Sequence, residues 1–108
     1  MKVAVATPDL MDRSRITTAL ASQPDIEVVF VGSPDALVGL AGVTAVLVDL
    51  SKRGALEALP AIVASAPRVV AYGSHVDRTL LDAARAAGVD EVLPRSAFFT
   101  RLPSILRV

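Results

Sequence analysis

The 108-residue sequence contains no cysteine and no tryptophan, and it has a single histidine, His75. The lack of cysteine excludes disulfides, thiol catalysis and thiolate metal sites, and one histidine gives little support to a nucleophilic triad. No apolar run approaches the ~20 residues that span a bilayer. An acid and a proline soon follow the short apolar start, which leaves no signal-peptide core. We therefore expect a soluble, cytoplasmic protein with no membrane partner.

The chain also lacks an excess of either charge, because 11 basic residues balance 11 acidic ones. This balance gives no reason to expect a nucleic-acid partner. Neither the G-x-G-x-x-G fingerprint nor a Walker-type phosphate loop occurs, and the turn "ATPDL" has too few hydroxyl and glycine residues to wrap a flavin phosphate. An enzymatic function would rest on fold analogy alone. We predict that the chain is not an enzyme and uses no cofactor.

What the sequence does contain is a series of five short, valine-rich runs with little alternation, which is typical of parallel strands covered on both faces. Segments with helical spacing separate them. This alternation predicts an α/β fold, an open parallel sheet with helices on both faces, in one domain over residues 1–108. The predicted strands are Val3–Ala6, Ile26–Val31, Ala45–Val48, Val69–Tyr72 and Glu91–Arg95, and the predicted core includes Val3, Val5, Val28, Val46, Val48, Val69, Ala71 and Val92.

Several helices carry their own start and stop signals. In "DRTLLDAARAAG", Asp77 is a good N-cap and Gly88 stands where the helix should stop. Pro34 suits the first position of a helix of about two turns. Pro60 predicts either a kink or a helix that effectively begins near it. The segment 96–108 predicts a short final helix that breaks or restarts near Pro103.

In such sheets, functional sites form where the carboxyl ends of the strands meet. Asp49 stands out there, because an ionised carboxylate at the end of a core strand is costly unless it is paired, metal-bound or exposed. The residues that the predicted strands deliver to this edge are Thr7, Pro8, Asp9, Asp49, Ser51, Lys52, Arg53, Gly73, Ser74, His75, Arg95 and Ser96.

Three stretches carry a family resemblance: "KVAVATPDLMDRSRI", "TAVLVDL" and "AGVDEVLPRS". In order and spacing, they resemble the receiver domain of the response regulators of bacterial two-component signal transduction, over essentially the whole chain. The resemblance implies a flavodoxin-like (CheY-like) sheet of five parallel strands in the order 2-1-3-4-5. It also implies a phosphorelay role for the aspartate at the end of the third strand, which Asp49 matches.

The rest of the receiver site is altered. The acidic pair that holds Mg²⁺ in receivers falls on Thr7 and Pro8, and only the next residue, Asp9, is acidic. The receiver hydroxyl residue falls on Gly73, with Ser74 one position later. The receiver lysine falls on Arg95, which keeps the charge in a different geometry.

We therefore expect Asp49 to anchor a metal-free polar cluster, either as an acid paired with Lys52 or Arg53 or as an acid that caps the loop after the strand. Asp9 is expected to cap a helix, since Asp9 and Asp49 alone would make a poor Mg²⁺ site. The Gly73-Ser74 loop could bind an anion through backbone N–H groups, or it is an ordinary loop.

The predicted function is that of an atypical receiver, or pseudo-receiver, which signals through contacts with a protein partner. One alternative is an active single-domain response regulator, phosphorylated on Asp49 and requiring Mg²⁺. A second alternative is a small-ligand or nucleotide-binding protein that uses the carboxyl-end edge of the sheet.

In receivers, the face formed by the fourth helix, the fifth strand and the final helix is the usual contact surface. Here mixed charge around two phenylalanines suits a homodimer. The alternative is a solvated face whose charges pair only locally. The residues expected on this surface are Arg78, Asp82, Arg85, Asp90, Arg95, Phe98, Phe99 and Arg101.

Overall fold

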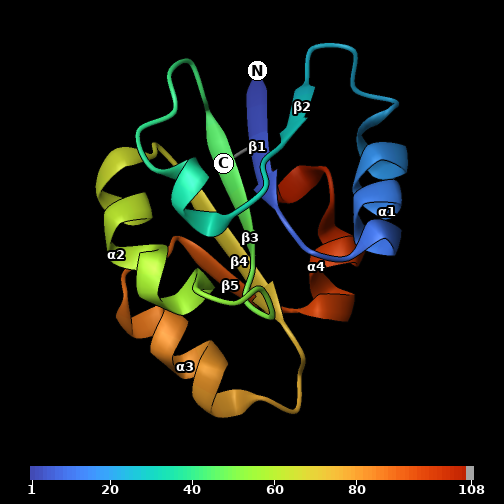
Figure 1. The fold of residues 1–108 in the computed structure, drawn as a ribbon. Helices are drawn as coiled ribbons and strands as arrows, with labels where there is room; N and C mark the ends of the chain where they lie inside the picture. Colours follow the sequence, from blue (N-terminus) through green and yellow to red (C-terminus); the bar gives the residue numbers. More distant parts are fainter. Residues whose placement is uncertain (107–108) are drawn as a thin grey trace.

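The computed structural model describes residues 1–106, and strands alternate with helices along them (Figure 1). The valine-rich runs form the strands, and each strand is followed by a helix or a single helical turn. In chain order the elements are β1 (Lys2–Ala6), α1 (Leu10–Leu20), β2 (Glu27–Phe30), η1 (Pro34–Leu37), β3 (Ala45–Asp49), α2 (Ala55–Ser65), β4 (Val69–Gly73), α3 (Arg78–Ala86), β5 (Glu91–Pro94), α4 (Arg95–Arg101) and η2 (Ser104–Leu106).

The five strands form one parallel sheet in the order β2-β1-β3-β4-β5, which confirms the predicted fold. Helices α1 and α4 pack together on one face of the sheet, and α2 and α3 pack together on the other (Figure 1). The register places Asp49 on β3 directly beside Tyr72 on β4. The carboxyl ends of β1, β3 and β4 therefore converge on one edge.

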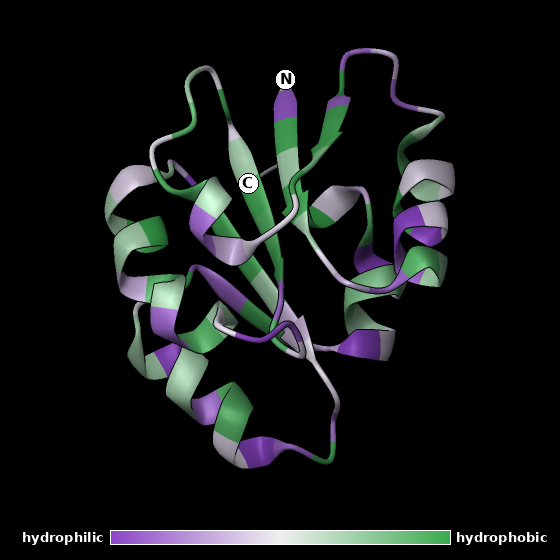
Figure 2. Cartoon of the chain, in the orientation of Figure 1, coloured by the Kyte–Doolittle hydropathy of each residue, from purple (hydrophilic) through white to green (hydrophobic). Residues whose placement is uncertain are grey.

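A separate apolar core lies on each face of the sheet. Val46 and Val48 belong to the core beneath α2 and α3, whereas Val3 and Val5 point into the core beneath α1 and α4. Figure 2 shows hydrophobic residues along the strands and a mixture of hydrophilic and hydrophobic residues along the helices around them. Of the eight predicted core residues, seven are buried and Val28 is half-buried, because β2 is an edge strand that is covered incompletely.

The predicted boundaries of α3 are confirmed. The carboxylate of Asp77 accepts a hydrogen bond from the backbone N–H of Leu80 at 3.2 Å, which caps the first turn. Gly88 follows the helix with φ +91°, a left-handed conformation that a side chain would disfavour. Among residues 1–106, no helix is long and apolar enough to cross a membrane.

One helix prediction was wrong in detail, and one of the two alternatives for another helix is excluded. The segment that begins at Pro34 forms a single 3₁₀ turn rather than two helical turns, although proline does occupy its first position. Helix α2 begins at Ala55 and contains Pro60, which excludes a start near the proline; the other alternative, a kink at Pro60, stays a prediction. The final segment does break around Pro103, as predicted, into α4 and η2. Residues 107–108 of that prediction lie outside the described residues.

Candidate functional site

Asp49 ends β3 with its side chain buried, and donors surround its carboxylate. The hydroxyl of Thr7 donates to Oδ2 at 2.7 Å. Ser51 donates to Oδ1 twice, from its backbone N–H at 2.9 Å and from its hydroxyl at 2.7 Å. A buried carboxylate must be compensated by hydrogen-bond donors or by an opposite charge. These hydrogen bonds therefore explain how the Asp49 carboxylate can be buried, with only 1% of the residue exposed. The predicted polar cluster around Asp49 therefore exists, and its donors are neutral.

Of the two roles expected for Asp49, the structure shows the loop-capping one, through Ser51, and not the ion pair. Neither Lys52 nor Arg53 forms an ion pair with Asp49 in the part of the chain that the structure describes. A tight turn follows β3, closed by the backbone N–H of Lys52 donating to the carbonyl of Asp49 at 3.1 Å. This turn brings Ser51, rather than a basic side chain, against the carboxylate.

A second buried carboxylate, Asp12, lies on the inner face of α1 and is the main site residue that the sequence interpretation missed. Its side chain is fully buried. The two terminal nitrogens of Arg95 donate to its two oxygens, and the phenol of Tyr72 donates to Oδ2 at 3.1 Å. A signal was available, because Asp12 occupies the i−4 position of the apolar stripe that continues with Ile16 and Leu20.

Tyr72 connects the two carboxylates. Burial raises the pKa of the Tyr72 phenol well above its ordinary value; a hydrogen bond with Thr7 opposes this rise, and the negative charge of Asp49 adds to it. The phenol is thus a neutral donor at physiological pH. Its ring stacks on Phe98, with centroids 4.1 Å apart and planes 11° apart. The cluster is therefore anchored to both β4 and α4.

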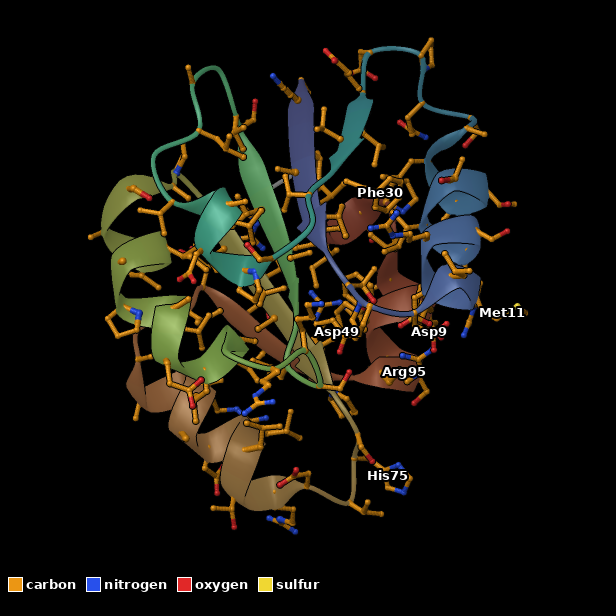
Figure 3. The ribbon with its side chains drawn as sticks, viewed as in Figure 1. Asp9, Met11, Phe30, Asp49, His75 and Arg95 are labelled. Carbon is orange, nitrogen blue, oxygen red and sulfur yellow. The ribbon has the colours of Figure 1, made fainter. Side chains whose placement is uncertain are left out.

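Asp9 caps α1, as predicted. Its Oδ1 accepts hydrogen bonds from the backbone N–H groups of Met11 at 2.8 Å and Asp12 at 3.2 Å. Its other oxygen lies 3.9 Å from Arg95, and Figure 3 shows Asp9 and Arg95 together at the base of α1, with Asp49 nearer the middle of the sheet. Pro8, between Thr7 and Asp9 in the sequence, is exposed.

The loop after β4 stays outside this cluster. Gly73 is the last residue of the strand, and the hydroxyl of Ser74 accepts a hydrogen bond from the N–H of Val76 at 3.4 Å rather than reaching Asp49. His75 is exposed and distant from the other labelled residues (Figure 3). Within residues 1–106, no group of three or more histidine and acidic side chains could hold a metal ion.

The predicted contact surface needs correction. Phe98 is fully buried beneath Tyr72, so it cannot contact a partner. Arg95 is engaged by Asp12. Phe99 is half-buried.

The charged residues of this surface mostly have partners within the chain. Arg85 pairs with Asp82 at 2.9 Å on the same helix, and Arg101 pairs with Glu91 at 3.3 Å. Asp90 accepts a hydrogen bond from the backbone N–H of Val69 at 2.7 Å, and Arg78 is exposed.

No family model and no curated protein matches the sequence. Similarity appears at the level of solved structures. The response regulator domain of CheB from Thermotoga maritima superposes with a TM-score of 0.79 and 21% identity, over 99% of this chain and 93% of that one. A response regulator from Hahella chejuensis gives a TM-score of 0.78 and 18% identity, over 97% and 91% of the two chains.

The isolated receiver domain of RcsB from Salmonella enterica serovar Typhimurium gives a TM-score of 0.79 and 18% identity, over 98% of this chain and 84% of that one. The chain spans 66% of the RcsB chain that was solved bound to a promoter. These matches establish that the chain has the CheY-like fold of response regulator receiver domains.

Proposed function

We propose that this chain is an atypical receiver domain that signals through protein contacts, without the Mg²⁺-dependent phosphorylation of an aspartate. The observation that carries this proposal is the state of Asp49. Both of its oxygens are occupied by donors from Thr7 and Ser51, and its side chain is 1% exposed. Attack on a phosphoryl donor would require this carboxylate to break those hydrogen bonds and reach solvent.

The composition of the site supports the same proposal. Phosphoryl transfer relies on a cation that neutralises the developing charge on the phosphoryl oxygens. Mg²⁺ needs several oxygen ligands in an octahedral array. Where the resemblance implies an acidic pair, this chain has Thr7, whose hydroxyl donates into Asp49, and the exposed Pro8. Asp9 uses one oxygen to cap α1.

Arg95 supports the proposal from the other side of the site. In receivers, the matching lysine is expected to reach the phosphoryl group. Here both terminal nitrogens of the guanidinium are held by the buried Asp12. Separating the Arg95 guanidinium from the Asp12 carboxylate is costly, because it leaves a buried negative charge uncompensated. Arg95 therefore serves to hold α4 against α1.

The second candidate function is an active response regulator that is phosphorylated on Asp49. Its support is the position of Asp49, the last residue of β3 at the carboxyl edge of the sheet. Intact mass spectrometry after incubation with acetyl phosphate and Mg²⁺ separates the two candidates.

We expect no mass increase in the wild type under conditions that phosphorylate an active receiver domain treated in parallel. A phosphoryl adduct on the wild type that is absent from Asp49→Asn would overturn the proposal. An adduct that forms equally on both proteins would place the reaction on a residue other than Asp49 and would contradict the expectation that no adduct forms.

A further inference from the structure

A hollow of about 320 Å³ lies between α1 and α4, on a helical face rather than at the strand ends. Its lining comes from Ser14, Arg15, Thr18 and Ala19 on α1 and from Phe99 on α4. The two helices run beside each other on the same face of the sheet (Figure 1). The volume lies at the lower end of the roughly 300–1,000 Å³ range of small-molecule pockets.

The cation in this hollow, Arg15, contacts an aromatic ring and has no ion-pair partner among residues 1–106. The guanidinium carbon of Arg15 lies over the Phe99 ring, 3.8 Å from its centroid, in a cation–π contact. Among the described residues, no acidic side chain forms an ion pair with Arg15. The only acid in α1 is Asp12, which is buried and pairs with Arg95. The hydrogen-bond donors of Arg15 therefore remain available to a ligand.

Two hydroxyl groups flank this cation. Ser14 and Thr18 are one helical turn apart, so both side chains stand on the same face of α1. Both residues are exposed. Thr17, by contrast, turns its hydroxyl back to the carbonyl of Arg13 at 2.8 Å. The hollow thus combines one planar cation and two hydroxyls with an apolar wall formed by Ala19 and Phe99.

We propose that this hollow binds a small organic monocarboxylate with a flat apolar body. One unpaired arginine compensates one negative charge, which favours a monoanion over a phosphate dianion. The planar fork of Arg15 matches the two oxygens of a carboxylate, and Ser14 and Thr18 can donate to the remaining lone pairs. The apolar body packs against Phe99 and Ala19.

Ligand binding in the hollow would affect the candidate site around Asp49 and Asp12, because an aromatic contact connects the two places. Phe99 meets Tyr72 edge to face, with ring centroids 5.8 Å apart. Tyr72 in turn donates to Asp12. A ligand that clamps α1 against α4 would therefore restrict the helices that hold the Asp12–Arg95 pair. This inference does not depend on whether Asp49 is phosphorylated.

The experiment is a titration of the full chain, labelled with ¹⁵N, followed by amide NMR spectra. The probe is phenylacetate, and the matched neutral control is phenylacetamide, which has the same shape without the charge. We expect phenylacetate to give saturable shifts at Ser14, Arg15, Thr18 and Phe99, with a Kd on the order of 1 mM for a ligand of this size. Phenylacetamide should bind at least about tenfold more weakly, since it cannot pair with the guanidinium.

Substitutions test which residue carries the recognition. Arg15→Gln should weaken phenylacetate binding by about tenfold or more, whereas Arg78→Gln, which changes an exposed arginine on α3, should leave it unchanged. The double variant Ser14→Ala/Thr18→Val changes only exposed hydroxyl residues and should weaken phenylacetate binding by about threefold. It provides a second test of the site in case the Arg15→Gln protein does not fold.

Three results would each overturn the assignment. One is a set of shifts that do not saturate or that fall outside the α1–α4 hollow. Another is equal affinity for phenylacetate and phenylacetamide. The third is a folded Arg15→Gln protein that binds phenylacetate as tightly as the wild type does.

Discussion

Asp12 and Asp82 are both paired with an arginine, yet their surroundings differ completely. The Asp12 side chain is fully buried and holds two donor groups, Arg95 and Tyr72. The Asp82 side chain is 71% exposed and pairs with Arg85 on the same helix. Removal of one partner from a buried pair leaves the other uncompensated, whereas an exposed pair contributes only ~0–1 kcal/mol.

We predict that Asp12→Asn lowers the free energy of unfolding by about 2–4 kcal/mol, because Arg95 loses its charged partner and Tyr72 a charged acceptor. The matched control Asp82→Asn should change it by no more than about 0.5 kcal/mol. Urea unfolding of the wild type and both variants gives the three values. Equal losses in the two variants would show that the Asp12 cluster is not a stabilising unit.

Helix α2 is stable despite the proline inside it. Pro60 is exposed, and its lack of an N–H removes the bond that residue 60 would donate to the carbonyl of Leu56. The helix persists because its inner face is buried at Ala58, Leu59 and Ile62. Packing of an apolar face therefore outweighs a local preference against helix.

We predict that Pro60→Ala raises the free energy of unfolding by about 1–2 kcal/mol. The restored helical hydrogen bond stabilises the folded protein by more than the greater flexibility of the unfolded chain, which alanine permits, destabilises it. The matched control is Pro34→Ala. Pro34 is buried and suits the first position of η1, so this change should be destabilising. Thermal unfolding followed by circular dichroism measures both. A loss of stability in Pro60→Ala would mean that the proline is favoured in this helix.

At the scale of the whole molecule, self-association depends on charges that are free to pair between copies. The structure favours local pairing, because Arg85 and Arg101 already have partners within the chain and Phe98 is buried. The Arg85–Asp82 pair lies between exposed side chains and is worth little to stability. Exchanging the Arg85–Asp82 pair for an equivalent pair with a second copy of the chain would therefore gain little free energy.

We accordingly predict that sedimentation equilibrium at high micromolar concentration gives a monomer mass for the wild type and for Arg85→Glu alike. The charge reversal removes the local pair without creating a surface that a second copy could use. Asp35→Lys, which reverses an exposed charge on η1, is the control for a general effect of charge. A wild-type dimer that Arg85→Glu dissociates, and that Asp35→Lys leaves intact, would restore the predicted contact surface.

Local patterns were enough to predict the parallel strands and several helix ends, whereas the strand order was predicted from the family resemblance. Valine-rich runs separated by helical segments indicate buried parallel strands wherever they occur, because both faces of such a strand must be apolar. The caps at Asp9 and Asp77 were also predictable, since a carboxylate just before a helix meets backbone N–H groups only a few residues away. Asp49 was placed correctly at the carboxyl end of β3, because it directly follows a continuous apolar run.

The partners of the buried charges were decided only by the tertiary structure. Arg95 lies 83 residues from Asp12 in the sequence, and Tyr72 lies 60 residues from it. Basic neighbours in the chain were one expected partner of Asp49, but the hydroxyl of Thr7, just after β1, and that of Ser51, in the turn after β3, bind it instead. Sequence patterns determine which face of an element is buried. Which side chains meet across that face depends on how the elements pack, because a buried charge must be satisfied by groups that the fold brings within hydrogen-bond distance.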